Sequence, residues 1–169
     1  MKVTRLTKWD AYLANGQKTN HILIRGQSIP DRFYHLAVKC LVQHLDGSLL
    51  FMQRHLDNKL FPGFFEASAA GSALYGENSE QAIRRELLEE TGLVPAKLTF
   101  SKRIVYKEDQ CLMDRYVALV DCPKDHITLQ NGETIAYQWV TKEDFKRFLE
   151  KYSVVPAHRL MLESLFLDK

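Results

Sequence analysis

Short runs of apolar residues separated by turn residues dominate the first half of the chain. The densest run is residues 35–44, HLAVKCLVQH, in which apolar side chains occupy both phases of a two-residue repeat. This pattern is typical of a strand that is covered on both faces. Residues 48–54 follow the turn signal Asp46-Gly47 and predict a second strand, and the sequence Phe-Pro-Gly-Phe at 61–64 then indicates a loop.

Two shorter apolar runs lie near the N-terminus, at residues 9–13 and 21–24, on either side of Asn15-Gly16. This residue pair suits the positive φ angles of a hairpin turn, so we expect an N-terminal β-hairpin within residues 1–30. A hairpin of this kind can also pair between two subunits, which leaves a homodimer open.

A helical period begins after Gly76. Asn78 or Ser79 can cap this helix, which we expect to run through Glu90 and to end at Gly92. Apolar residues four positions apart form the face that packs against the sheet.

Strands and helices also alternate in the second half of the chain. The pattern predicts strands at residues 99–106, 112–120 and 134–140, a helix capped by Thr141 that runs to about Lys151, and a final amphipathic helix after Pro156 with Leu162, Leu165 and Phe166 on one face. No repeat or linker interrupts these elements. We therefore expect one α/β domain over residues 1–169, in which residues 1–30 form a hairpin extension and residues 31–169 form the core and the C-terminal helices.

Composition excludes several classes of protein. A formal net charge of +2 does not indicate a nucleic acid polymer as partner. No apolar stretch reaches the roughly 18–20 residues that span a bilayer, and the N-terminus has no apolar signal-peptide core. The three cysteines have no CxxC spacing, which is typical of a reducing compartment. The expected location is the cytoplasm.

Three glutamates, Glu86, Glu89 and Glu90, lie on one side of the predicted helix, within an arc of about 100°. Carboxylates this close repel one another, and they become favourable when a divalent cation lies among them. Oxygen ligands alone select a hard ion such as Mg²⁺, with Mn²⁺ as a substitute. For Glu89 and Glu90 taken alone, a solvated acidic helix face is the more frequent explanation, so the surrounding pattern decides.

The positions around the glutamates fit the same chemistry. Arg85 precedes the cluster, and its guanidinium can hold a carboxylate in bidentate geometry, with Glu77 at the helix start as the expected partner. Gly71 allows a close backbone approach and can lend a carbonyl oxygen to a metal ion. Nine positions between residues 71 and 93 are specified together, and chance agreement is on the order of one in a billion.

This segment resembles the Nudix box, G-x5-E-x7-R-E-U-x-E-E-x-G-U with U apolar, at every defined position. The resemblance implies an α/β/α sandwich with a mixed central sheet. It also implies hydrolysis of a diphosphate linkage in a small-molecule substrate, either a nucleoside diphosphate derivative or a related organic diphosphate. The implied metal ligands are Glu86, Glu89, Glu90 and the carbonyl of Gly71, and Arg85 orients the cluster.

The general base varies within the family, and two residues are open here. Glu86 lies in the box itself. Glu133 lies six residues before Trp139, a Nudix-like position, although a surface turn is also typical of that residue. Either carboxylate can take the proton of the attacking water.

The flanking residues resemble the isopentenyl-diphosphate isomerase branch of Nudix proteins. They include His35-Leu36-Ala37, Phe61-Pro62-Gly63 and Tyr137-Gln138-Trp139. By this resemblance, Arg54 and Lys59 bind the substrate diphosphate, and a surface charge is the alternative for each.

Isomerase chemistry itself is not expected. Isomerases of this branch need a cysteine just before the box glycine, and this chain has Ala70 there; two metal-ligand histidines of the family are replaced by Ser28 and Ser72, although His35 is retained. The sequence therefore predicts a hydrolase, with isomerase-like activity and a non-catalytic nucleotide-binding module as the alternatives.

Overall fold

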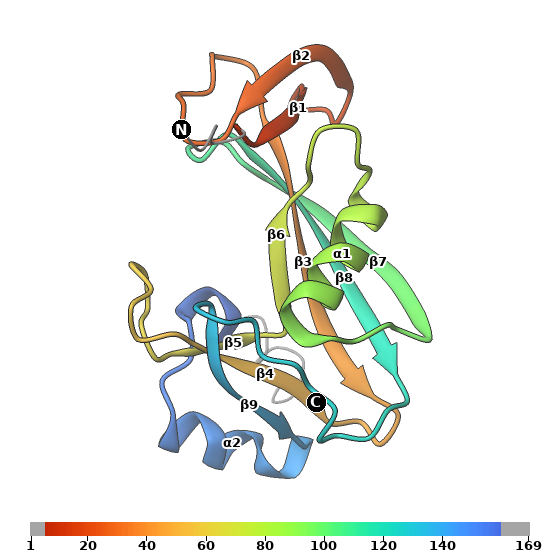
Figure 1. Cartoon of the computed structure of the whole chain (residues 1–169), viewed down its shortest axis with the longest axis vertical. Coiled ribbons are helices and arrows are strands. Elements are labelled where there is room, and N and C mark those ends of the chain that lie inside the picture. Colours follow the sequence, from red (N-terminus) through yellow and green to blue (C-terminus); the bar gives the residue numbers. More distant parts are fainter. Residues whose placement is uncertain (1–5, 160–169) are drawn as a thin grey trace, which may run out of the picture.

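The computed structural model describes residues 6–159 and consists of a mixed β-sheet, a separate N-terminal hairpin and helices on both faces of the sheet (Figure 1). The elements are β1 (Lys8–Tyr12), β2 (Lys18–Ile24), β3 (His35–His44), β4 (Leu49–Arg54), β5 (Phe65–Ala67), β6 (Ala69–Ser72), α1 (Ser79–Thr91), β7 (Lys97–Tyr106), β8 (Cys111–Val120), β9 (Thr134–Val140) and α2 (Lys142–Lys151).

The main sheet has the order β5-β4-β3-β8-β7, with β6 paired to β3 and β9 paired to β4. Strands β3 and β8 are parallel along all ten residues, whereas the other pairs are antiparallel, so the expected mixed sheet is confirmed. Pairing between β3 and β4 is limited to Gln43 with Leu49. The two strands therefore diverge, and β6 occupies the edge of β3 that β4 leaves free (Figure 1).

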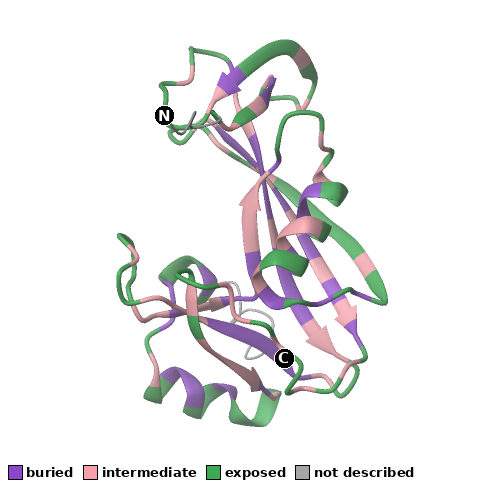
Figure 2. Cartoon of the chain, viewed as in Figure 1, coloured by how far each residue is buried: buried purple, intermediate pink, exposed green. Residues whose placement is uncertain are grey.

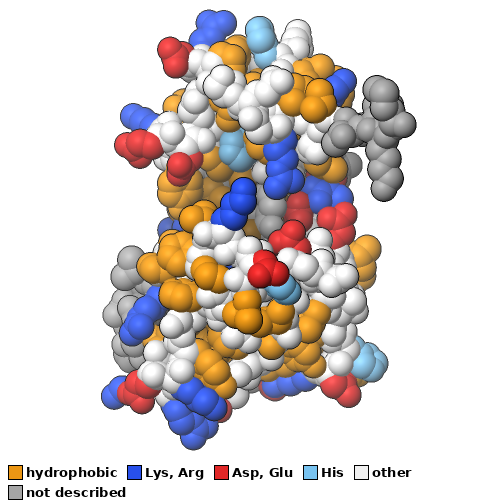
Figure 3. Space-filling view, turned by 60° about the vertical axis from the view of Figure 1, so that its left-hand side comes forward, with side chains coloured by type: hydrophobic (Ala, Val, Ile, Leu, Met, Phe, Trp, Pro, Cys, Tyr) orange, Lys and Arg blue, Asp and Glu red, His pale blue; other side chains and the backbone are white. Residues whose placement is uncertain are grey.

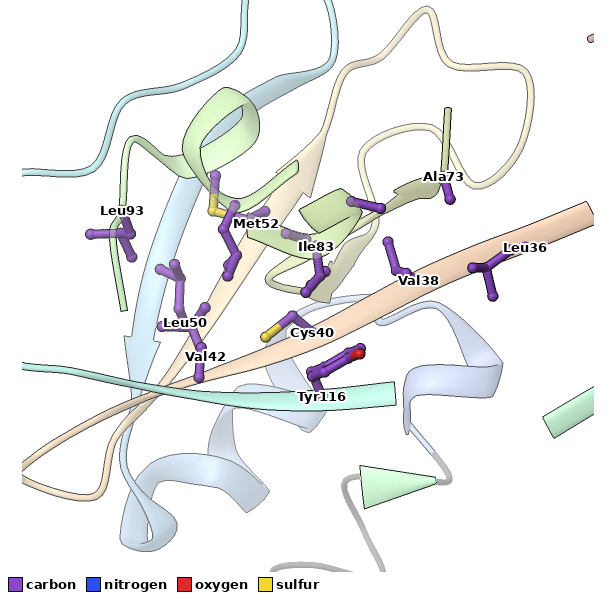
Figure 4. Close-up of a cluster of buried hydrophobic side chains, with 14 of the residues drawn as sticks. Leu36, Val38, Cys40, Val42, Leu50, Met52, Ala73, Ile83, Leu93 and Tyr116 are labelled. Atoms are coloured by element: carbon purple, nitrogen blue, oxygen red, sulfur yellow. The ribbon is translucent and has the colours of Figure 1, made fainter. Parts of the chain in front are cut away.

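Helix α1 covers one face of β3 and β6. Its buried residues Ile83 and Leu87 join a core cluster with the even-numbered side chains of β3, among them Val38 and Cys40 (Figure 4). The side chain of Asn78 caps the helix by accepting the Gln81 N–H at 2.8 Å, and the Gln81 side chain accepts the Asn78 N–H in return.

Helix α2 covers β4 and β5 in the other arm of the sheet. Phe145 and Phe148 pack on Phe51 and Phe65, with the rings of Phe51 and Phe148 4.7 Å apart. Figure 2 shows the buried residues of both helices on the sides that face strands. The predicted cap is confirmed, because the Thr141 hydroxyl accepts the Asp144 N–H at 3.2 Å.

The N-terminal hairpin is also confirmed, and it contacts the segment that leads into α1. The Asp10 carboxylate is 4% exposed and accepts the Gly76 N–H at 2.8 Å. It also pairs with Lys18 at 2.7 Å. Gly76 has φ 88°, a conformation that favours glycine. The hairpin therefore holds the turn that leads into α1.

Two short strands, β5 and β6, are absent from the sequence prediction. They contain three and four residues, and β6 is made of alanine, glycine and serine, which have low strand propensity. Pairing with β4 and β3 creates them. The final predicted helix is helical at residues 156–159, and Leu162, Leu165 and Phe166 lie outside the described residues. Within the described part of the chain, no helix has the length and apolar character needed to cross a membrane.

Candidate active site

The open edge of β6 is the base of the candidate site. Along an antiparallel edge strand, the backbone N–H and C=O groups of alternate residues are directed inward, where they bond to the partner strand, or outward, away from the sheet. The Ala73 N–H bonds to Leu36 at 2.9 Å, which makes Gly71 another inward residue. Ala70 and Ser72 point outward: the Ala70 N–H donates to Glu90 at 3.1 Å, and the Ser72 carbonyl accepts from Arg85 at 3.1 Å. Glu90 and Arg85 of α1 therefore approach the free side of β6.

Arg85 holds the carboxylates of α1 in place. Its guanidinium donates to both oxygens of Glu77, at 2.8 and 3.0 Å, as the sequence predicts. It also donates to Glu86 at 2.7 Å and to Glu89 at 3.2 Å. The hydrogen bonds from Arg85 lower the pKa of Glu77, which is therefore a fixed anion. Arg85 thus links the start of the helix to its acidic face.

Gly71 lies directly beneath the Glu86 carboxylate. A Cβ atom on Gly71 would lie 2.0 Å from Glu86 Oε1, so no side chain fits at this position. Because Gly71 is an inward residue of β6, its carbonyl is directed toward β3. The absence of a side chain at Gly71 therefore leaves the space that the Glu86 carboxylate occupies.

The Glu90 carboxyl has a strongly perturbed pKa. Its pKa is raised from 4.5 to about 8, mainly by burial. The negative charges of Glu86, Glu66 and Glu133 contribute to the increase, and the Ala70 N–H acts against it. Burial also raises the pKa of Glu86, although the hydrogen bond from Arg85 partly offsets this. The carboxylates of α1, of Glu66 in β5 and of Glu133 in the turn before β9 therefore create a strongly negative region.

A cavity of about 140 Å³ lies at this region. It is lined by Met52, Arg54, Glu66, Ser68, Ala69, Ala70, Glu90, Glu133 and Thr134. Three carboxylates and one guanidinium thus border a small space next to the edge of β6.

The donor set suits a divalent cation. Within residues 6–159 no three acidic, histidine or cysteine side chains are already gathered in ligand geometry, since Glu86 and Glu89 bond to Arg85 and Glu90 bonds to Ala70. However, burial and, to a lesser extent, repulsion from neighbouring carboxylates raise the pKa of Glu90, and a positive ion placed among the same oxygens would stabilise its charged form. Oxygen donors without sulfur or nitrogen favour a hard ion.

The other predicted residues lie at different distances from this cavity. Glu133 is exposed in a turn, yet it lines the cavity and acts on Glu90. Arg54 lines the cavity too, and its guanidinium donates to Glu66 at 2.8 Å and to the Leu60 carbonyl at 3.0 Å. Lys59 is exposed in the loop and does not line the cavity.

Two charged residues of this region, Glu66 and Lys39, were not predicted from the sequence. Glu66 lies between buried Phe65 and Ala67, and its alternation in a three-residue strand is too short to recognise. Lys39 is a single lysine in the apolar run of β3, which was a visible signal. Its pKa is lowered to about 8 by burial, and its ammonium contacts the ring of His158.

Comparisons with known proteins agree with this geometry. The family model described as NUDIX domain matches residues 33–165. An uncharacterized Nudix hydrolase of Listeria monocytogenes is 29% identical over 151 residues, which cover 89% of each chain. An isopentenyl-diphosphate Delta-isomerase of Salmonella arizonae is 32% identical over 120 residues, 67% of this chain and 65% of that protein.

Solved structures share the fold. A Deinococcus radiodurans protein superposes with a TM-score of 0.65 at 19% identity, covering 90% of this chain and 96% of that one. The NUDIX domain of NrtR from Shewanella oneidensis, solved with ADP ribose, has a TM-score of 0.62 at 19% identity and covers 82% of this chain and 92% of its own.

Proposed function

This chain belongs to the NUDIX domain family, and from that premise we propose that it is a Mg²⁺-dependent hydrolase that cleaves a diphosphate linkage in a nucleoside diphosphate derivative or a related organic diphosphate. Nudix hydrolases act on diphosphate-containing compounds and generally use a divalent metal ion. The observation that carries the proposal is the perturbed Glu90 carboxyl, which shares a cavity with Glu66 and Glu133 beside the rest of the acidic helix face.

Glu86, Glu89 and Glu90 are the proposed metal ligands. Mg²⁺ bound there would supply positive charge to the diphosphate and would acidify a water molecule. A backbone carbonyl of β6 is proposed as a further ligand of the metal ion. The resemblance to the Nudix box implies the carbonyl of Gly71 as a further ligand, and this stays a proposal. Because strand alternation turns that carbonyl toward β3, we propose the outward carbonyl of Ala70 as the alternative ligand.

Arg85 acts as the orienting residue. Its bonds to Glu77, Glu86 and Glu89 hold two of the proposed ligands at fixed positions before a substrate arrives. Preorganisation of this kind lowers the cost of reaching the transition state. A carboxylate then takes the proton from water as the water attacks one phosphorus in line. Glu86 and Glu133 both stay proposals for this base, since Glu86 adjoins the other ligands and Glu133 lines the cavity.

A substrate screen tests the function directly. We expect the purified protein to release phosphate, after coupling to a phosphatase, from at least one class among ADP-ribose, dinucleotide cofactors, nucleoside triphosphates and non-nucleotide diphosphates. EDTA should abolish the release, and added Mg²⁺ should restore it. Absence of turnover with every class in the presence of Mg²⁺ or Mn²⁺ would contradict the proposal and favour a non-catalytic binding module.

Arg54→Ala is expected to raise KM more than it lowers kcat, because a cation that contacts the diphosphate equally in the ground and transition states contributes mainly to binding. Steady-state kinetics on a substrate identified in the screen would measure the two effects. Arg147→Ala is the charge-matched control, since Arg147 is exposed on α2. Lys59→Ala tests the second predicted contact. An unchanged KM in Arg54→Ala would remove the assignment.

The protein is expected not to isomerise isopentenyl diphosphate. The position of the isomerase cysteine is Ala70, whose backbone N–H is bonded to Glu90 and whose methyl group cannot exchange a proton. Incubation with isopentenyl diphosphate, followed by analysis for the dimethylallyl isomer, is the measurement. Appearance of that isomer would show that another residue replaces the thiol.

We also propose a cytoplasmic location. Its support is that all three cysteines are free, and the thiols of Cys40 and Cys111 are buried.

A further inference from the structure

A row of basic side chains begins beside Ala70, which lines the acidic cavity, and extends across the sheet to β7. In the strand register, Ala70 of β6 lies beside Lys39 of β3, Lys39 beside Arg115 of β8, and Arg115 beside Lys102 of β7. Register partners point to the same face of a sheet. Lys39, Arg115 and Lys102 therefore form one row, the basic stripe, on the face opposite α1.

Among the described residues, no ion pair neutralises the charges of the basic stripe. Within residues 6–159 no carboxylate lies within salt-bridge distance of Lys39, Lys102 or Arg115. The acid that acts most on Lys39 is Glu66, and the Glu66 carboxylate is bonded to Arg54. Lys39 and Arg115 are half-buried, whereas Lys102 is exposed at the end of the row. Half-buried cations without an acidic partner are costly in a folded protein, so an anion beside Lys39 and Arg115 would relieve that cost.

Arg115 is held in position with bonding capacity to spare. Its Nη2 donates to the Tyr106 hydroxyl at 3.2 Å, while its Nε–H is buried and has no partner among the described residues. An N–H group in that state is rare in native structures. The guanidinium is therefore oriented by Tyr106 with one donor unused.

His158 gives an independent view of the local charge. It is 4% exposed, and its Nδ1 accepts the Ala67 N–H at 3.0 Å. Its pKa is lowered to about 3, mainly by burial, with a contribution from the positive charges of Lys39, Arg115 and Arg54. His158 is therefore neutral at physiological pH and does not change the charge of the stripe.

Figure 3 shows basic and acidic side chains gathered at the hollow in the middle of the molecule.

We propose that the basic stripe binds a second anionic group of the substrate, a phosphate beyond the diphosphate that is cleaved. This inference rests on the proposed function and specifies its substrate class. Neighbouring strands lie about 4.8 Å apart, so Arg115 is roughly 10 Å and Lys102 roughly 14 Å from the edge strand β6. The scissile diphosphate is shorter than this span. The stripe therefore selects diphosphates that carry an additional phosphate group at their far end.

The first test measures anion binding without catalysis. Inorganic triphosphate is titrated into the full chain in EDTA and followed by calorimetry. Wild type should bind, and Lys39→Met and Arg115→Met should each bind about 10- to 100-fold more weakly, as expected for loss of a charged hydrogen bond. Lys107→Met, an exposed lysine outside the stripe, should bind as wild type does. Melting curves establish that each variant is folded, and Arg115→Lys supplies a second variant that keeps the charge.

The second test measures selectivity. NADPH and NADH differ by one phosphate group, and wild type should hydrolyse NADPH with a kcat/KM about tenfold higher or more. Arg115→Met should lose this ratio, and Lys107→Met should keep it. Equal triphosphate affinity in wild type and Arg115→Met would overturn the inference, as would a selectivity ratio that Arg115→Met leaves intact. If triphosphate binds through Arg115 but no diphosphate is hydrolysed, the anion site stands and the proposed hydrolase activity fails.

Discussion

Replacing Glu90 by glutamine is expected to lower kcat on the order of 10³-fold, the upper range for loss of one group that stabilises charge in the transition state. The amide keeps the shape of the side chain but loses the negative charge that a divalent ion requires. Steady-state turnover of a diphosphate substrate in saturating Mg²⁺ is the measurement. Glu80→Gln is the matched control, because Glu80 lies on the same helix but pairs with Arg84 on the exposed side.

The same substitution should stabilise the metal-free protein. The Glu90 carboxyl has an ordinary pKa of 4.5 and a folded-state pKa of about 8. The folded state thus keeps its proton to higher pH than the unfolded chain, so stability from this group is fully present below pH 4.5 and is lost as pH rises to about 8. Above that pH, Glu90→Gln should unfold with a free energy about 1–3 kcal/mol greater than wild type.

Denaturant unfolding at pH 4 and at pH 8.5 in EDTA measures this difference. Added Mg²⁺ should raise the Tm of wild type at pH 8.5, since a ligand that binds only the folded state stabilises it, and should leave Glu90→Gln nearly unchanged. Full turnover in Glu90→Gln, or an equal response of both proteins to Mg²⁺, would remove Glu90 from the metal site.

Gly71→Ala is expected to lower kcat about 100-fold, the effect of displacing a catalytic group by roughly 1 Å. The added Cβ atom would lie 2.0 Å from Glu86 Oε1, and the carboxylate must move away from its position beside Arg85. Gly71 does not have a positive φ, so alanine adds no backbone strain there.

Gly26→Ala is the matched control, because it is expected to lower stability and to leave kcat unchanged. Gly26 has φ 88° with open space around it, and alanine should cost about 1 kcal/mol of stability without changing kcat. Kinetics and thermal melting of both variants separate the two effects. Wild-type kcat in Gly71→Ala would show that the position of Glu86 is not critical.

Residues that are close in sequence made much of this site predictable. Arg85 and Glu77 were recognised as partners because they lie in one short segment, with Glu77 at the start of the helix. The bonds at 2.8 and 3.0 Å form because the turn before the cap residue Asn78 places the Glu77 carboxylate within reach of the long Arg85 side chain. The resemblance to the Nudix box and to the isomerase branch is confirmed by the family model and by the relatives. Periodicity also located β3, α1, β9 and α2 to within a residue or two.

Contacts between distant segments were not predictable in the same way. Glu66 affects the pKa of Glu90 only because two consecutive short strands pair with different partners. Strand β5 pairs with β4, whereas β6 pairs with β3. The basic stripe exists only in the register of three strands, β3, β8 and β7, since its members lie at positions 39, 115 and 102 of the chain. The direction of the Gly71 carbonyl likewise depends on which edge of β6 is paired.

The sequence by itself determined the helix and its acidic face, because an α-helix places neighbouring residues at fixed angles whatever surrounds it. Only the tertiary structure decided how buried Glu90 is, which carboxylates and cations lie near it, and which backbone groups face outward. Those properties depend on strand pairing between segments that are far apart in the chain. Burial and pairing in turn determine the electrostatic energy of each charged group, because that energy varies with the surrounding dielectric and with the distance to other charges.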